Sequence, residues 1–198
     1  MGKHLPGLIL VIIALSISGC GDKGAEPEKT APELIAEGWQ AYEARDYGGA
    51  LSKFNEVVTK DATLADAYTG LGWTNAKLNV LSSAVTNFSQ CLSLDPRNLD
   101  AKAGLAFVYN AQNEYSQSIT KANEVLSIDP NWSFSHDNTL SSGDLHLLIA
   151  ENYYALAEFE NSLTEVRSFL NTSFAADVTT PEGRAALAAE IERLRGVV

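Results

Sequence analysis

Positive charge and cysteine are scarce in this chain. Its 198 residues include 14 Lys and Arg against 25 Asp and Glu, which gives a net charge of −11 at pH 7. No cluster of basic residues offsets this acidity, and an acidic surface repels phosphate backbones, so we exclude nucleic acid as a partner. The two cysteines, Cys20 and Cys91, occupy dissimilar sequence settings. We therefore expect no disulfide bond between them.

Recognisable catalytic patterns are also missing. We find no nucleophile–base pair, phosphate-binding loop or carboxylate pair at a catalytic spacing in the sequence. His136, Asp137 and His146 come nearest to a metal site, but they lack a further ligand at a recognisable spacing. We predict a protein that is not an enzyme and that uses neither a cofactor nor a metal.

The apolar run near the start of the chain is too short to span a membrane. It extends from Leu8 to Ile17 and follows Lys3 and His4. Ten helical residues rise about 15 Å, which is half of the roughly 30 Å hydrocarbon thickness of a bilayer. A positive start, a short apolar run and small residues after it are typical of an export signal.

The run ends on Ile17-Ser18-Gly19-Cys20, which resembles the lipobox of bacterial lipoproteins. The resemblance implies a signal peptide over 1–19 that is cleaved before Cys20, with a diacylglyceryl group in thioether linkage on Cys20 and acylation of the new amino terminus by a fatty acid such as palmitate. Two or more acyl chains anchor a protein stably. Residues 20–30 are polar and contain Gly and Pro, so we expect a flexible tether. By resemblance to enterobacterial sorting rules, Gly21 after the cysteine implies the periplasmic face of the outer membrane in a Gram-negative cell.

A repeat of 34 residues runs through the rest of the chain. Ala50-Leu51-Ser52-Lys53-Phe54 aligns with residues 84–88 and again with 118–122. Gly38 and Gly72 recur at the same interval, as do Asp61, Asp95 and Asp129, the last two of which precede a proline. A proline ends a helix and restricts the residue before it, so each Asp-Pro marks the end of a unit.

This pattern resembles the tetratricopeptide repeat, a helix–turn–helix unit. The resemblance implies an all-α, tetratricopeptide-type α-solenoid of about four units over 31–174, namely 31–64, 65–98, 99–132 and 143–174, with an insertion at 133–142. Small residues at the helix contacts, such as Gly38, Gly72 and Ala50, allow close packing. One residue of each unit is expected on the apolar face near the end of the second helix, and these residues are Val57, Cys91, Val125 and Phe169.

The family binds its ligands in a concave groove lined by the first helix of each unit. Carried over residue by residue, the partner-binding groove is predicted to contain Ile35, Trp39, Tyr42, Thr69, Trp73, Lys77, Phe107, Asn110, Leu147, Glu151 and Tyr154. Trp39, Trp73 and Phe107 are each 34 residues apart and should form a row of aromatic rings on one face. The row is either a set of anchors for a partner or a set of rings packed against adjacent helices. Lys77 is the single cation among these residues, so an acidic peptide tail is not expected.

The insertion is polar but carries two aromatic residues. Trp132, Phe134, His136 and Asp137 are its candidate functional residues, because insertions in solenoids form loops that often carry function. We favour a structural interpretation, in which Trp132 and Phe134 pack on the neighbouring unit and His136 makes a hydrogen bond. The alternative is an enzyme or ligand site built on His136 and Asp137.

The end of the chain, 175–198, is predicted to form a capping helix. Thr180 precedes Pro181, and Leu187, Ile191 and Leu194 form one apolar stripe. Glu190 is expected on the solvent side. Such a helix would cover the last unit of the stack.

Taken together, these patterns favour a membrane-anchored, protein-binding scaffold or assembly factor of the bacterial envelope. A small-molecule or glycan receptor that uses the groove aromatics is the alternative. A repeat class with many unrelated roles does not identify the partner.

Overall fold

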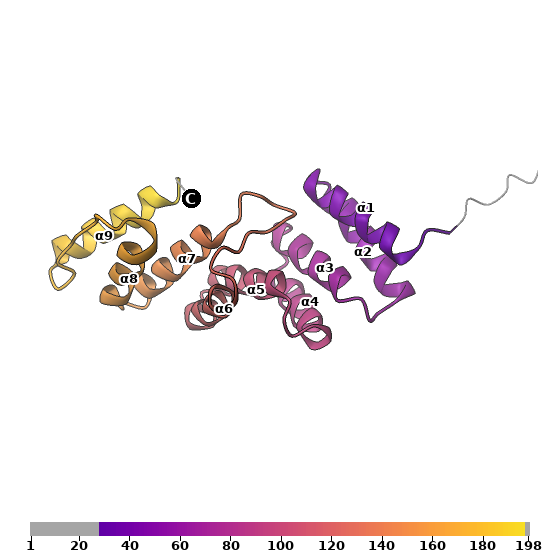
Figure 1. The fold of residues 1–198 in the computed structure, drawn as a ribbon, viewed down its shortest axis with the longest axis horizontal. Helices are drawn as coiled ribbons and strands as arrows, with labels where there is room; N and C mark the ends of the chain where they lie inside the picture. The colour runs from indigo at the N-terminus through magenta and orange to yellow at the C-terminus, as the bar shows by residue number, and fades with distance from the viewer. Residues whose placement is uncertain (1–27, 197–198) are drawn as a thin grey trace, which may run out of the picture.

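The computed structural model describes residues 28–196, and these form an elongated stack of antiparallel helix pairs (Figure 1). The predicted lipidation site Cys20, the signal peptide over 1–19 and most of the tether lie outside the described residues. The helices are α1 (Ala31–Glu43), α2 (Tyr47–Lys60), α3 (Ala65–Lys77), α4 (Leu81–Leu94), α5 (Leu99–Ala111), α6 (Tyr115–Ile128), α7 (Ser142–Ala155), α8 (Phe159–Glu165) with a π-helical continuation (Val166–Leu170), and α9 (Pro181–Leu194). The expected all-α solenoid is confirmed.

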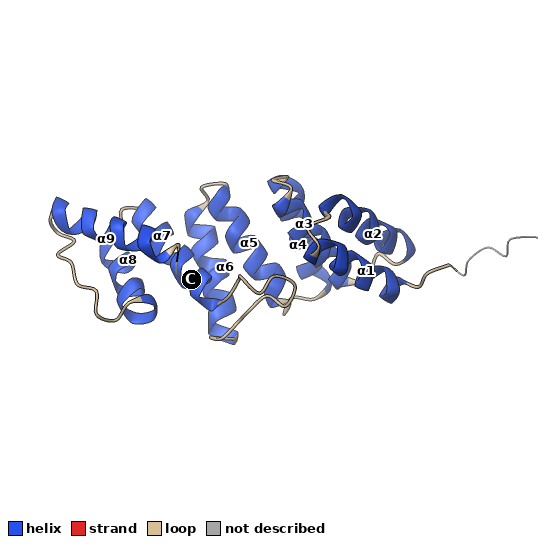
Figure 2. Cartoon of the chain, turned by 90° about the horizontal axis from the view of Figure 1, so that it is seen from above, coloured by secondary structure: helices blue, strands red, loops and turns tan. Residues whose placement is uncertain are grey.

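The pairs follow one another along the long axis of the molecule (Figure 2). The first helices of successive pairs contact one another, α1 with α3, α3 with α5 and α5 with α7. They therefore form one layer of the stack. None of the helices in the described range is long and apolar enough to cross a membrane.

Every pair turns through the same backbone conformation. One residue in each turn has a left-handed φ of about 60°, and these residues are Arg45, Asn79, Asn113 and Ala157. In the first turn the N–H of Asp46 donates to the carbonyl of Ala41 at 2.8 Å and that of Arg45 to Tyr42 at 2.9 Å. This pair of bonds is a Schellman motif, which satisfies the last carbonyls of the helix.

Glycine allows two phenylalanine rings to seat between consecutive pairs. A Cβ on Gly70 would stand 2.3 Å from Cζ of Phe54, and one on Gly104 would stand 2.2 Å from Cζ of Phe88. Both rings are fully buried. Gly38 and Gly72 contact the same rings from the other side, with Cβ distances of 2.7 and 2.4 Å. The glycines are thus required for close packing, as predicted, but the repeat pattern did not single out Gly70 and Gly104.

The fourth unit departs from the predicted pattern. Val57, Cys91 and Val125 are fully buried as expected, but Phe169 is 59% exposed. In the first three units the N–H of the residue that follows the second helix donates to the carbonyl four residues earlier. In the fourth unit the N–H of Asn171 donates to the carbonyl of Val166, five residues earlier. The extra residue in this π turn rotates Phe169 out of the core, so its predicted buried position is wrong.

The capping helix α9 packs where a further unit would begin. Thr180 accepts a hydrogen bond from the N–H of Gly183 at 3.0 Å. Leu187, Ile191 and Leu194 are buried in a cluster with residues of α7 and α8. Glu190, expected to face solvent, is only 9% exposed because Arg193 and Asn171 hold its carboxylate against the fold.

Cys91 is a free thiol in the core between α3 and α4. Its Sγ lies 3.0 Å from the hydroxyl of Thr69, and burial raises the pKa of the thiol. Thr69 is therefore a core residue rather than a groove residue, which corrects the prediction. A protonated, buried thiol behaves as a small apolar side chain.

Candidate functional site: the concave face and its inserted loop

The segment between α6 and α7 is much longer than the other connections between pairs. It comprises residues 129–141. We call residues 131–141 of this segment the inserted loop. Figure 1 shows it reaching back along the stack toward α1. Its own backbone holds it together, because Ser142 donates to the carbonyl of Trp132 at 2.7 Å and Phe134 to that of Leu140 at 3.0 Å. The loop is thus an ordered element that crosses the first helices.

Two rings of the loop lie on the two groove tryptophans. The Phe134 ring stacks on Trp73 with centroids 4.4 Å apart and an interplanar angle of 21°. The His136 ring is parallel to Trp39 at 3.8 Å. As a result Trp39 is 5% exposed and Trp73 is 3% exposed. A partner can reach this part of the predicted aromatic row only by displacing the loop.

A histidine–carboxylate hydrogen bond and an ion pair fasten the loop at its rim. His136 Nδ1 lies 2.8 Å from Oε1 of Glu43 on α1, and Lys77 Nζ on α3 lies 2.8 Å from Oδ2 of Asp137. Partial burial alone would raise the pKa of Asp137, but hydrogen bonds from Lys77 and Thr139 outweigh it and hold the pKa below its ordinary value. The carboxylate of Asp137 is therefore charged when it meets Lys77.

Trp132 anchors the base of the loop. Its indole Nε1 donates to Oδ1 of Asp100 on α5 at 2.8 Å. Burial raises the pKa of Asp100, and the indole donor opposes that rise. The structural interpretation of Trp132 and Phe134 thus agrees with the structure in that both are buried. It did not predict how far along the stack the loop reaches, because Phe134 packs on the first two units and not on the adjacent unit.

Two hydrogen-bond donors beneath the loop have no partner. In the described chain the buried side-chain atoms without a hydrogen bond are Tyr42 Oη, Trp73 Nε1 and Thr74 Oγ1. Tyr42 and Trp73 both contact the Phe134 ring. A buried donor without an acceptor costs about 1–3 kcal/mol. Burial also raises the pKa of Tyr42 far above its ordinary value, so the phenol keeps its proton.

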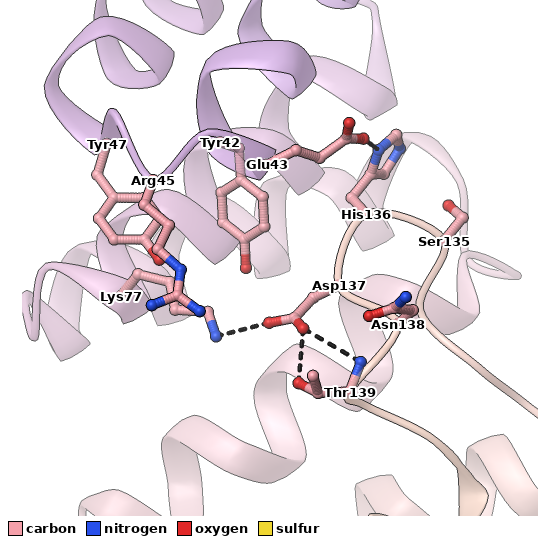
Figure 3. A pocket seen from close by; sticks show the side chains of 10 residues that line it. All are labelled: Tyr42, Glu43, Arg45, Tyr47, Lys77, Ser135, His136, Asp137, Asn138 and Thr139. Atoms are coloured by element: carbon pink, nitrogen blue, oxygen red, sulfur yellow. Dashed lines mark hydrogen bonds and ion pairs between the residues drawn. The ribbon is translucent and has the colours of Figure 1, made fainter.

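A polar cavity of about 580 Å³ opens beside the loop at the first turn. Figure 3 shows Lys77, Asp137 and the Tyr42 hydroxyl converging at its centre, with Arg45 at the left of the view. The lining residues are Tyr42, Glu43, Arg45, Tyr47, Lys77, Ser135, His136, Asp137, Asn138 and Thr139. Arg45 adds a second cation that the groove positions did not predict, because it comes from a turn and not from a first helix.

The other end of the concave face is covered by α9. Arg195 Nε lies 2.5 Å from Oε1 of Glu151, and Tyr154 Oη donates to the carbonyl of Arg184 at 3.3 Å. Leu147 is buried in the cluster with α9. These three predicted groove residues therefore contact the capping helix.

The three remaining predicted groove residues are partly buried, namely Ile35, Phe107 and Asn110. Ile35 and Phe107 are half-buried against the core, and Phe107 lies near Trp73 with ring centroids 6.1 Å apart. The amide of Asn110 donates to Asn152 at 2.6 Å. The structure thus places the loop over groove residues of α1 and α3, and α9 over groove residues of α7.

The two histidines nearest to a metal pattern are engaged separately. His136 contacts Glu43, while His146 Nδ1 lies 2.6 Å from Oε1 of Glu165 and its ring stacks on Phe169 at 4.0 Å. Within residues 28–196 no three His, Cys, Asp or Glu side chains are grouped so that they could hold a metal ion.

No protein-family model matches this chain, and no curated protein matches it. Solved structures do. The crystal structure of MamA aligns over 85% of this chain and 82% of its own, with a TM-score of 0.61 and 17% identity. TTC0263, a thermophilic tetratricopeptide repeat protein from Thermus thermophilus, aligns over 84% of each chain, with a TM-score of 0.57 and 22% identity.

A tetratricopeptide repeat protein from Parabacteroides merdae aligns over 84% of this chain and 60% of its own, with a TM-score of 0.60 and 16% identity. This chain has the tetratricopeptide fold. At these identities the likeness concerns the fold alone. In the present structure an inserted loop lies on the concave face of this tetratricopeptide solenoid.

Proposed function

We propose that this chain is a membrane-tethered, protein-binding scaffold of the bacterial envelope, and that the concave face of its first two units is the binding surface. One observation carries the proposal: that face already binds a segment of the chain, whose His136 and Phe134 rings stack on Trp39 and Trp73. Large aromatic residues dominate binding energy at protein interfaces, and grooves of this kind suit extended peptides.

The membrane part of the proposal rests on the lipobox-like sequence that ends at Cys20. The folded part begins directly after the proposed tether, because Thr30 and Glu33 form a capping box at the start of α1. A lipid on Cys20 would hold the solenoid next to the membrane surface, where envelope proteins are its available partners.

The binding surface can be tested by photo-crosslinking in intact cells. A photoreactive residue replaces Ser135 or Asn138, both lining the cavity, and the matched controls replace Thr120 or Asn123, both exposed on α6. We expect a protein crosslinked from the first pair and absent from the second. Crosslinks from both pairs alike, or from neither, would contradict the proposal.

The anchor has its own test. The Cys20→Ser variant should leave the membrane fraction, while the wild-type chain should remain in it. If both chains fractionate alike, the lipid anchor is wrong, and the crosslinking result still decides the binding surface.

A small-molecule receptor is the second candidate, and the cavity beside the loop supports it. Its 580 Å³ volume lies within the roughly 300–1,000 Å³ of ligand sites. Its lining is polar and charged, however, whereas such sites have mainly apolar walls. Quenching of tryptophan fluorescence by a small ligand, without any crosslinked protein, would favour this candidate.

A further inference from the structure

The inserted loop is longer than its connecting role requires. The links that join α2 to α3 and α4 to α5 are residues 61–64 and 95–98, whereas α6 and α7 are joined by residues 129–141. The extra length carries the loop to α1 and α3, past the pairs that it connects. Its placement therefore follows from its contacts with the first two units and not from chain connectivity.

The loop meets the concave face as a short peptide would. Phe134 and His136 are two residues apart and both place their rings on tryptophans. The chain turns between them, because the N–H of Asp137 donates to the carbonyl of Phe134 at 3.2 Å. The next residue, Asp137, gives its carboxylate to Lys77. The contacts thus define a recognition pattern of an aromatic residue, any residue, a flat ring and an acid.

The fit between the loop and the face is incomplete. Trp73 Nε1 is buried without an acceptor, and so is Tyr42 Oη, which points into the polar cavity beside the loop. An external segment with the same side chains and with an oxygen acceptor near these two donors would form the hydrogen bonds that the loop does not form. By contrast, the rim contacts to Glu43 and Lys77 are partly exposed to water and so contribute little to holding the loop in place.

We propose that the inserted loop is a displaceable occupant of the concave face, and that it holds the site of an external segment that turns in the same way and carries an aromatic–x–ring–acid pattern. This inference rests on the proposed function and names the class of its partner. Because the loop is part of the same chain, its effective concentration at the face is on the order of millimolar. The partner binds only against this competition, and the loop thereby sets a threshold for binding.

The test uses the full-length chain purified in detergent and a fluorescent peptide with the sequence of residues 131–141. The double variant Phe134→Ser, His136→Ser removes both loop rings from the face. We expect the variant to bind the peptide at least about tenfold more tightly than the wild-type chain does, as measured by fluorescence anisotropy. A control peptide with alanine in place of its phenylalanine should not bind. A folded variant that binds neither peptide would overturn the proposal.

Hydrogen exchange on the wild-type chain keeps the proposal testable if the variant fails to fold. A displaceable loop opens more often than the helices beneath it, so the amides of Phe134 and Leu140 should exchange at least about tenfold faster than those within α5. Equal protection would show that the loop is a fixed part of the core. Peptide binding without any crosslinked envelope protein would instead leave this inference intact and contradict the proposed function.

Discussion

The concave face of the solenoid is covered at both ends by segments of its own chain, and the two covers are built differently. At the C-terminal end α9 inserts Leu187, Ile191 and Leu194 into a closed apolar cluster with α7 and α8. At the N-terminal end the inserted loop adds Trp132 and Phe134 to the buried core, and Phe134 and His136 stack on tryptophans. Its rim is closed by one ion pair and one histidine hydrogen bond.

Hydrogen bonding separates the two covers further. The one buried carboxylate of α9, on Glu190, accepts bonds from Arg193 and Asn171. The loop instead leaves donors on Tyr42 and Trp73 unpaired. A covering segment that supplies hydrogen-bond partners for the polar groups it buries is a permanent part of the fold. One that leaves buried donors unpaired is easier to exchange for another segment. Four changes test this difference.

The largest effect is expected from Leu187→Ala in α9. The side chain is fully buried in the cap cluster, and its truncation leaves a cavity that costs about 2–5 kcal/mol. Urea unfolding followed by circular dichroism measures the loss. Ala185→Ser, on the exposed side of the same helix, is the control and should be nearly neutral.

Phe134→Ala in the loop should cost less, although its ring is 1% exposed. Truncating a buried phenylalanine in a closed core costs about 3–5 kcal/mol, but a loop can open to water and leave no cavity, so we expect about 1–2 kcal/mol. Tryptophan emission should also shift to the red as Trp39 and Trp73 become hydrated. A loss as large as that of Leu187→Ala would make the two covers equivalent. Ser135→Ala is the neutral control.

Glu190→Gln tests the polar contact of α9 through its pH dependence. The hydrogen bonds from Arg193, the largest cause, and from Asn171 lower the pKa of Glu190 to about 2 from an ordinary 4.5. A depressed pKa means that the stabilisation is complete above pH 4.5 and is lost as the pH falls toward 2. At pH 7 the variant should lose about 1 kcal/mol, since Arg193 is half exposed. Its stability should also depend less on pH between 4.5 and 2, and an unchanged profile would contradict the assignment.

The smallest effect is expected from Asp137→Asn at the loop rim. The variant loses the partly exposed ion pair with Lys77, which is worth about 0.5 kcal/mol. Amides of residues 133–140 should exchange roughly twofold faster, and high salt should remove the difference by screening the pair. Glu124→Gln, which breaks ion pairs on α6, should leave the loop amides unchanged.

The repeat made most of the fold predictable, because each unit reuses one packing solution. The 34-residue spacing located the small residues at Gly38 and Gly72 and the aliphatic positions at Val57 and Val125, and all of them pack as expected. The prediction failed at Phe169 and Glu190, in the last unit and the cap. There the π turn and the contact with Asn171 are particular to this chain, so no repeat pattern reports them.

The candidate site was predictable only in part. The row of groove rings and the insertion were both visible as sequence features, and Trp132, Phe134, His136 and Asp137 were singled out. That His136 would lie on Trp39, 97 residues earlier in the chain, could not be inferred from either feature. The register of a loop on a distant surface is not periodic, and so it leaves no pattern to detect.

The sequence by itself determined the helical units and their order, because apolar spacing, small residues and helix ends act within one unit or between neighbours. The tertiary structure decided what the concave face presents. Whether Trp39 and Trp73 face a partner or the chain itself depends on contacts between segments far apart in sequence, and such contacts depend on how the units stack and on where an irregular loop can reach.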